Sequence, residues 1–260
     1  MFINNGNIKI YIEKDYTAMS ERAAGFFAER AVKNPSGAFG FATGSTPVGM
    51  YNALVEKYRK GELDFSQLST FNLDEYYPIE CDNDQAYRYF MEQHLFNHVN
   101  LNKANINLLN GETEDATLEC GAYEEKIRLA GGIVLQILGI GTNGHIGFNE
   151  PDEYFSGTTG VVNLTKSTID DNARFFENRD QVPRKALSMG IRTIMSAGEI
   201  LLLANGRNKS KIISDALFGR ITPQVPASIL QVHHHVSVLL DELAAEDILP
   251  FFYESSEEVI

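Results

Sequence analysis

Residues 133–151 read IVLQILGIGTNGHIGFNEP, and this stretch decides the fold class. The apolar run Ile133–Ile140 is typical of a buried strand, and a glycine-rich turn follows it. Pro151 ends the turn before an amphipathic helix can begin. The chain outward from this stretch repeats the same kind of apolar run. Five further runs, each bounded by Gly, Asn or Asp, are predicted as buried strands: Ile8–Ile12, Ala38–Ala42, Leu68–Phe71, Ile200–Ala204 and Val236–Leu240.

Amphipathic segments separate these runs. Apolar residues recur at helical spacing in Thr17–Val32, Val48–Tyr58, Glu119–Leu129 and Lys209–Phe218. Strand and helix alternate along the chain, which predicts an α/β fold with a mostly parallel sheet covered by helices on both faces. Ligands of such sheets bind beyond the carboxyl ends of the strands, so chemistry is expected in the segments that follow the strands.

Composition and charge narrow the function classes. The chain has 260 residues, 43% of them hydrophobic and 22% charged, which is ordinary globular composition. No apolar run approaches the roughly 20 residues of a spanning helix, and the start lacks a basic leader, so a cytoplasmic protein is expected. Cys81 and Cys120 form no metal or redox motif and are expected to be reduced thiols. The net charge of -13 argues against nucleic acid and anionic membranes as partners.

The loop after the second predicted strand resembles an anion site. Thr43-Gly44-Ser45-Thr46-Pro47 precedes a helix, with Thr46 predicted as its N-cap and Pro47 as its first residue. Helix N–H groups and hydroxyls there would suit a phosphate. The alternative is a plain capped helix, and the P-loop pattern is absent.

Two adjacent acids follow the third predicted strand. Asp74 and Glu75 point to opposite faces if the strand continues, so at most one faces a cleft, where it could act as a general base. A solvated loop acid is the alternative.

The turn after Ile133–Ile140 carries the densest group of polar residues. His145 could act as an acid or a base, and Glu150 could orient it and stabilise its charged form. A structural histidine in a turn remains the alternative. The pattern Gly139-x-Gly141-x-x-Gly144 formally matches a dinucleotide fingerprint, which we reject because no helix and no later acidic strand end follow.

Two basic residues could complete an anion site in this acidic protein. Arg174 can form a fork onto a phosphate, and Lys209 begins the last predicted helix. Either is an ordinary surface charge if it acts alone.

Taken together, these segments resemble the glucosamine/galactosamine-6-phosphate isomerase family. The resemblance runs from about Ala38 to Ala245 and rests on several motifs in the same order. They are ATGSTPVGMY, STFNLDEYY, INLLNGE, YEEKI, ILGIGTNGHIGFNEP, ARFF, QVPRKALSMGI and PASILQ. The resemblance implies a single domain over residues 1–260 with a Rossmann-like three-layer α/β sandwich.

The resemblance also implies an activity. Members convert glucosamine 6-phosphate and water into fructose 6-phosphate and ammonia, a hydrolase reaction of amino-sugar catabolism that uses no metal or nicotinamide cofactor. It makes Asp74 the base that moves a proton between C2 and C1 of the sugar. His145 would assist ring opening, with Glu150 and Asn143 as its partners.

The resemblance extends to the substrate-binding residues. Thr43, Gly44, Ser45, Thr46, Gly141, Arg174 and Lys209 would bind the sugar phosphate, and Tyr87 would lie on the segment that covers the site.

Three departures and several rivals remain. Some members have Asp where this chain has Asn143, and often Ser where it has Ala86. An allosteric, hexameric branch has basic residues where this chain has Gly160 and Val162, so we predict no activation by N-acetylglucosamine 6-phosphate and leave monomer or homo-oligomer open.

The rival activities are a galactosamine-6-phosphate deaminase, a 6-phosphogluconolactonase of the same fold and a sugar-phosphate-sensing regulator. The regulator would need a DNA-binding module, and this chain has no basic helix to supply one.

Overall fold

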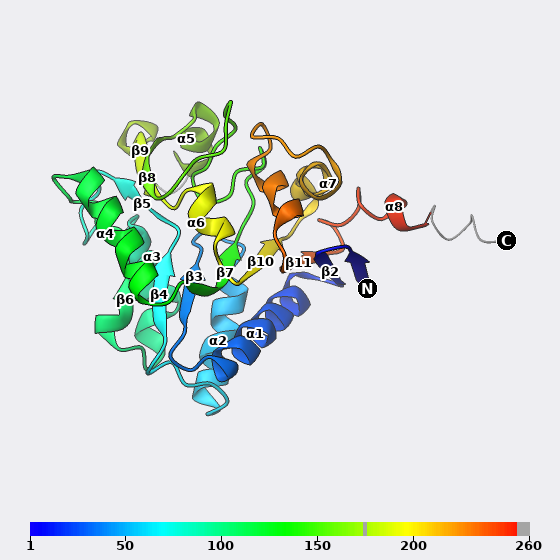
Figure 1. Ribbon diagram of the computed structural model, residues 1–260, viewed down its shortest axis with the longest axis horizontal. Coiled ribbons are helices and arrows are strands. Elements are labelled where there is room, and N and C mark those ends of the chain that lie inside the picture. The colour runs from blue at the N-terminus through cyan, green and yellow to red at the C-terminus, as the bar shows by residue number, and fades with distance from the viewer. Residues whose placement is uncertain (174–175, 254–260) are drawn as a thin grey trace.

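One large sheet organises the chain (Figure 1). The computed structural model describes residues 1–173 and 176–253. Every neighbouring pair of strands in this sheet is parallel except β1 and β2, which confirms the predicted mostly parallel sheet. The eight strands, in spatial order, are β1 (Phe2–Asn5), β2 (Ile8–Glu13), β11 (Val236–Asp241), β10 (Glu199–Ala204), β7 (Ile133–Leu138), β3 (Ala38–Phe41), β4 (Ser69–Asn72) and β6 (Ile106–Asn107).

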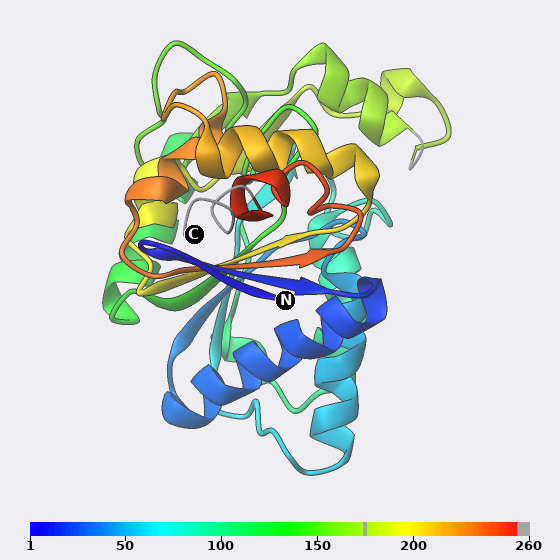
Figure 2. The same ribbon diagram turned by 90° about the vertical axis from the view of Figure 1, so that its right-hand side faces the viewer.

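Helices cover both faces of this sheet, as predicted. Figure 2 shows α1 and α2 below the sheet and α7 above it. The four predicted helices are present, with ends within a few residues of those expected. The helices are α1 (Tyr16–Lys33), α2 (Val48–Arg59), α3 (Tyr87–His94), α4 (Ala116–Leu129), α5 (Lys166–Asn172), α6 (Ile191–Met195), α7 (Ser210–Phe218) and α8 (Pro250–Tyr253).

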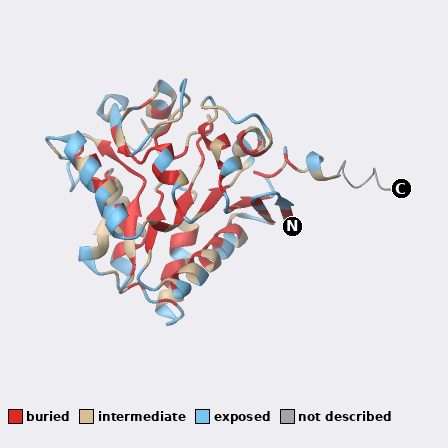
Figure 3. Ribbon diagram, in the orientation of Figure 1, coloured by how far each residue is buried: buried red, intermediate tan, exposed pale blue. Residues whose placement is uncertain are grey.

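The core lies between the sheet and the inward faces of the helices (Figure 3). Asp15 caps α1 by accepting a hydrogen bond of 2.8 Å from the Ala18 backbone N–H, which fixes where the helix begins. From that start, Phe27 points into the core, and its ring centroid lies 4.8 Å from that of Phe39 and 5.6 Å from that of Phe41. Full burial of each such side chain stabilises the fold by about 1.5–3 kcal/mol.

A second, smaller sheet was not expected from the sequence. It is antiparallel, with the order β5 (Asp74–Tyr77), β9 (Lys185–Ser188) and β8 (Gly160–Asn163). Leu73 alone connects β4 of the large sheet to β5 of the small one. Its N–H donates to Phe41 O in the large sheet, and its carbonyl accepts from Met189 N at 2.7 Å. The chain therefore changes sheets at one residue and places Asp74 at the junction.

The strand order reverses between β3 and β7. From β3 the chain proceeds outward through β4 to β6, and then returns to the other side of β3 for β7, β10 and β11. Open α/β sheets bind ligands at such a reversal, beyond the carboxyl ends of the strands. The loops after β3 and β7 are among those that the sequence analysis singled out.

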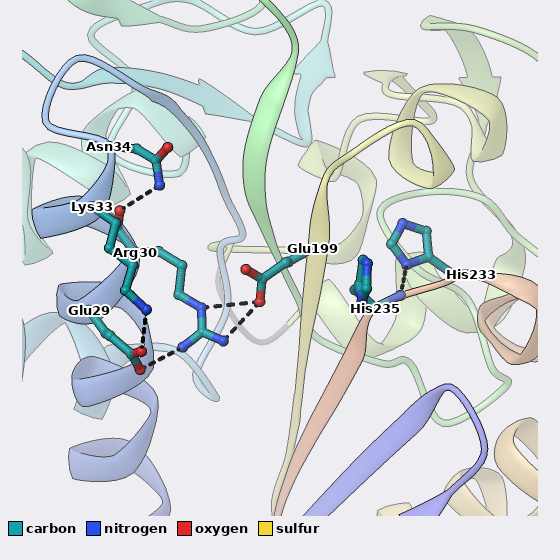
Figure 4. A network of polar contacts seen from close by, with 7 residues as sticks. All are labelled: Glu29, Arg30, Lys33, Asn34, Glu199, His233 and His235. Atoms are coloured by element: carbon teal, nitrogen blue, oxygen red, sulfur yellow. Dashed lines mark hydrogen bonds and ion pairs between the residues drawn. The ribbon is translucent and has the colours of Figure 1, made fainter.

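A polar network lies at the amino end of β10, opposite the carboxyl ends of the strands, and supports the fold (Figure 4). The Arg30 guanidinium of α1 lies 2.9 and 3.1 Å from the Glu199 carboxylate at the start of β10. Nearby, His233 accepts a hydrogen bond at Nδ1 from His235 N and contacts Ala197 O through Nε2 at 2.9 Å. These contacts join α1 to the start of β10, and the segment before β11 to the turn before β10, far from the strand ends where the chemistry is expected.

Candidate active site

A cavity of about 430 Å³ lies where the strand-end loops meet. Most of the predicted site residues line it, namely Thr43, Gly44, Ser45, Thr46, Asp74, Tyr87, Gly141, His145 and Lys209. Asn143 and Glu150 lie behind His145 instead of in the wall. Arg174 lies outside the described residues. The loops that the sequence suggested separately are therefore brought together into one site.

The loop after β3 forms one end of the cavity. Gly44 has a φ of +98°, which an L side chain rarely adopts. The prediction that Thr46 caps α2 was wrong, because Pro47 occupies the N-cap position and the helix begins at Val48. Thr46 instead donates its hydroxyl hydrogen to Asn205 Oδ1 at 2.9 Å. This bond ties the β3 loop to the loop that follows β10.

Tyr16 of α1 performs the capping that Thr46 does not. Its hydroxyl accepts a hydrogen bond of 2.8 Å from Gly49 N in the first turn of α2. The same hydroxyl lies 3.1 Å from the carbonyl oxygens of Ser45 and Thr46. One side chain from a different helix thus holds the loop, which keeps the hydroxyls at 43–46 in the cavity wall.

The loop after β10 adds the cation and two amides. Lys209 ends the 3₁₀ turn Arg207–Lys209, just before α7, and its Nζ donates to Ile140 O at 2.7 Å. The ammonium is therefore held at the mouth of the β7 loop. The Asn205 and Asn208 side chains line the cavity beside it. The sequence analysis missed both, although their position directly after a strand end was a signal for them.

Asp74 and Glu75 occupy opposite environments, as the alternation of a strand predicts. Asp74 lines the cavity, and no hydrogen bond reaches its carboxylate from residues 1–173 or 176–253. Burial, with the adjacent Glu75 carboxylate adding to it, raises the pKa of Asp74 to about 8. Glu75 points away and accepts three backbone N–H bonds. An unbonded carboxylate with a raised pKa at a cavity wall has the properties of a general base.

His145 is held by close packing. A Cβ on Gly141 would lie 2.3–2.5 Å from three atoms of the His145 ring, so only glycine allows the ring this position. The Gly141 N–H also donates to His145 O at 2.9 Å. Gly141 therefore places the imidazole in the cavity wall. Behind the ring, His145 Nδ1 lies 3.4 Å from Glu150 Oε2.

Glu150 is kept ionised by its neighbours. Burial alone would raise its pKa, but the adjacent imidazole of His145 and hydrogen bonds from Thr168 and Asn143 outweigh burial and lower the pKa of Glu150 to about 2. Asn143 donates to Glu150 Oε2 at 2.7 Å, and its own Oδ1 accepts from His145 N at 3.2 Å. The predicted group of Asn143, His145 and Glu150 is therefore contiguous, with a fixed negative charge beside the imidazole.

Aromatic rings form the remaining wall. The Tyr87 ring at the start of α3 stacks on Phe148, with 6.0 Å between the ring centroids. The centroid of the Tyr76 ring lies 4.9 Å from that of Tyr87. Thr168 and Asn172 of α5 also line the cavity. The sequence analysis did not identify these two residues, because nothing local marks α5 as a neighbour of the β7 loop.

Among residues 1–173 and 176–253, no three His, Cys, Asp or Glu side chains gather in a way that could hold a metal ion. None of the helices there combines the length and apolar character needed to cross a bilayer.

Comparison with known proteins adds to this geometry. The family model described as glucosamine-6-phosphate isomerases/6-phosphogluconolactonase matches residues 14–239. The chain is 52% identical to a glucosamine-6-phosphate deaminase of Alkaliphilus metalliredigens (strain QYMF), over 92% of this chain and 98% of that one. It is 51% identical to a glucosamine-6-phosphate deaminase of Clostridioides difficile (strain 630), over 95% and 99% of the two chains.

Solved structures agree with the fold. A structure of a monomeric glucosamine-6-phosphate deaminase superposes with a TM-score of 0.89 at 39% identity, over 92% of this chain and 99% of that one. A 6-phosphogluconolactonase from Thermotoga maritima superposes with a TM-score of 0.72 at 19% identity, over 90% and 99% of the two chains. At that identity the second likeness concerns the fold alone.

Proposed function

This chain belongs to the glucosamine-6-phosphate isomerase/6-phosphogluconolactonase family, and from that premise we propose that it is a glucosamine-6-phosphate deaminase. Relatives about half identical over nearly the whole chain carry that name, whereas the lactonase structure is 19% identical. The reaction converts glucosamine 6-phosphate and water into fructose 6-phosphate and ammonia. Because water is consumed and a C–N bond is broken, we class the enzyme as a hydrolase of amino-sugar catabolism.

The phosphate binds at the end of the cavity formed by the β3 and β10 loops. The Ser45 and Thr46 side chains and the ammonium of Lys209 face the same space. This local site offsets the net charge of -13, which otherwise repels an anion. Anchoring the phosphate away from the reacting carbons supplies binding energy that orients the sugar. Arg174, outside the described residues, is proposed as a further phosphate ligand on the resemblance alone.

Ring opening comes first, and His145 moves the proton that it requires. The pyranose opens when the C1 hydroxyl loses a proton and the ring oxygen gains one. An imidazole suits this step because it both accepts and donates near neutral pH. The ionised Glu150 behind the ring complements the positive charge that His145 carries while it holds the proton.

Asp74 then moves a proton from C2 to C1. It removes the C2 proton of the open-chain amino aldehyde while the aldehyde oxygen gains the proton that the C2 ammonium releases, which gives an enolamine. Return of the first proton to C1 leaves a protonated imine at C2. Water adds to the imine carbon, ammonia leaves, and the ketone of fructose 6-phosphate remains. A substrate ammonium on C2 would favour the ionised form of Asp74 when the sugar binds. Each such acid–base group typically contributes about 10²–10⁴-fold to the rate.

One observation carries the proposal: a carboxylate that accepts no hydrogen bond from the described residues, a supported imidazole and an end lined by hydroxyls and an ammonium face one cavity. A lactonase needs no carbon base, so Asp74 would have no role in one. We expect the enzyme to act in the cytoplasm, as a monomer or a homo-oligomer; size exclusion with light scattering distinguishes the two states.

The decisive experiment gives the purified protein glucosamine 6-phosphate, galactosamine 6-phosphate and 6-phosphogluconolactone in parallel. Ammonia and fructose 6-phosphate in equal amounts from the first substrate are expected. A higher kcat/KM for galactosamine 6-phosphate would change the assigned sugar, and lactone hydrolysis without ammonia release from either amino sugar would overturn the proposal.

A further inference from the structure

Glu75 has a buried carboxylate that the proposed mechanism does not use. The residue is 3% exposed, and its side chain reaches from β5 to the start of α3. Oε1 accepts from Tyr76 N at 3.0 Å and from Tyr87 N at 2.8 Å, and Oε2 accepts from Arg88 N at 3.0 Å. Burial raises the pKa of Glu75 to about 7, and these three bonds, which favour the charged form, oppose that rise.

These bonds replace a missing helix cap. Ala86 occupies the N-cap position of α3 and has no side-chain acceptor for the free N–H groups of the first turn. Glu75 supplies that acceptor from another element, and its charge is favourable at a helix N-terminus. Because Tyr87 is the first residue of α3, the same bonds fix where its ring enters the cavity wall.

The charge of Glu75 also lies next to Asp74 along β5. The two side chains leave opposite faces of the strand, so Glu75 does not reach the cavity but remains the nearest like charge to Asp74. Other titratable groups also face Asp74. They are Tyr76 of β5, Tyr87 of α3, Tyr123 of α4, and His145 and Lys209 across the cavity. Those five groups are phenols, an imidazole and an ammonium, so Glu75 is the carboxylate in this set of described neighbours of Asp74.

Glu75 is the more readily ionised of the two acids. Burial raises the pKa of both carboxyl groups, but three backbone N–H groups donate to Glu75 and oppose that rise, whereas no described residue donates to Asp74. The charged form of Glu75 is therefore favoured by its hydrogen bonds, and Asp74 ionises next to it.

Building on the proposed deaminase function, we propose that Glu75 is a positioning residue with two effects. Its carboxylate holds Tyr87 in the cavity wall, and its negative charge makes Asp74 a stronger proton acceptor. A negative neighbour disfavours ionisation of Asp74 and strengthens its conjugate base, which is what removal of a proton from carbon requires. The two adjacent acids thus have different roles. Asp74 contacts the sugar, whereas Glu75 raises the basicity of Asp74 and holds Tyr87 in place.

The test compares Glu75→Gln, which keeps the size and loses the charge, with Glu75→Asp, which keeps the charge and shortens the reach. Asp115→Asn is the matched control, because Asp115 caps α4 through Leu118 N and does not line the cavity. Carboxyl-carbon NMR titration without substrate, with the Asp74 signal identified by its loss in Asp74→Asn, reports the midpoint of Asp74 directly. The pH profile of kcat/KM reports the same group in the working enzyme.

In Glu75→Gln the Asp74 midpoint and the acidic limb of kcat/KM should both fall by roughly one pH unit. The plateau kcat should fall about tenfold. In Glu75→Asp the limb should move less than half as far, while KM rises because Tyr87 is held less firmly. Asp115→Asn should leave both measurements at the wild-type values.

An unshifted midpoint in a folded Glu75→Gln protein would overturn the tuning role, and an unchanged KM in Glu75→Asp would overturn the bracing role. If Glu75→Gln does not fold, an Asp74 midpoint in Glu75→Asp at the position expected for the neutral variant would contradict the proposal. The titration needs no turnover. A wild-type protein that releases no ammonia therefore refutes the proposed function while the NMR result still judges Glu75.

Discussion

Replacing Asp74 with Asn should stabilise the protein at alkaline pH while removing its activity. The substitution keeps the shape of the side chain and deletes its charge. In the folded protein the pKa of Asp74 is raised by burial from 3.8 to about 8. The folded state therefore binds this proton more tightly than the unfolded chain does. The stabilisation is complete below about pH 4 and is lost as the pH rises toward 8.

The size of the effect follows from the same values. Each pKa unit corresponds to about 1.4 kcal/mol, so between pH 5 and pH 8 the wild type should lose at most roughly 4 kcal/mol of unfolding free energy through this group. The amide of the variant does not titrate. The stability difference between Asp74→Asn and wild type should therefore grow in favour of the variant by at least about 2 kcal/mol over that window.

The assay is urea unfolding of both proteins at pH 5, 6, 7, 8 and 9, followed by fluorescence and circular dichroism. Proton exchange at C2 of the substrate, measured in deuterated water, should be lost in the variant. The exposed capping carboxylate removed by Asp115→Asn provides a control that should give no such widening difference. Parallel stability curves for Asp74→Asn and wild type would refute the reasoning, since they would mean that Asp74 ionises in the fold without cost.

Three further predictions concern the rest of the site. His145→Gln should lower kcat by about 10²-fold or more for the cyclic sugar and less for an open-chain analogue, because only the former needs the ring opened; equal losses would argue against that role. Gly141→Ala should lower kcat at least about tenfold, since the new methyl lies within 2.5 Å of the His145 ring. Gly121→Ala is its control, because its Cβ meets nothing within 4 Å; wild-type kcat in Gly141→Ala would show that the ring tolerates displacement. Rate curves should stay unchanged when N-acetylglucosamine 6-phosphate is added, since Gly160 and Val162 carry no charge; a sigmoidal curve that becomes hyperbolic would contradict this.

Most of the large sheet could be predicted from the sequence. The runs at Ile133–Ile140 and Val236–Leu240 became β7 and β11 with ends displaced by one or two residues. Such strands are buried on both faces, so their composition alone identifies them. The small sheet could not be predicted in the same way. Its strands have four residues each, too few for a clear alternation of apolar and polar residues. A single residue, Leu73, separates β4 from β5.

The residues of the candidate site also fall into those that could be predicted from the sequence and those that could not. Asp74 and His145 were identifiable because each follows an apolar run, and strand ends of parallel sheets meet at one edge. Thr168 and the capping role of Glu75 were not identifiable. Each depends on a contact between segments far apart in the chain or on different elements, such as the bond from Thr168 to Glu150.

The amino-acid sequence by itself determined which segments are buried strands, which loops carry reactive groups, and that an acidic protein must bind its anion locally. These are consequences of local composition and periodicity. Only the tertiary structure decided which carboxylate faces the cavity, what caps α2 and α3, and that Glu150 stays ionised behind His145. Those outcomes depend on distances of a few ångströms between segments that periodicity does not relate, and such distances govern burial, hydrogen bonding and charge.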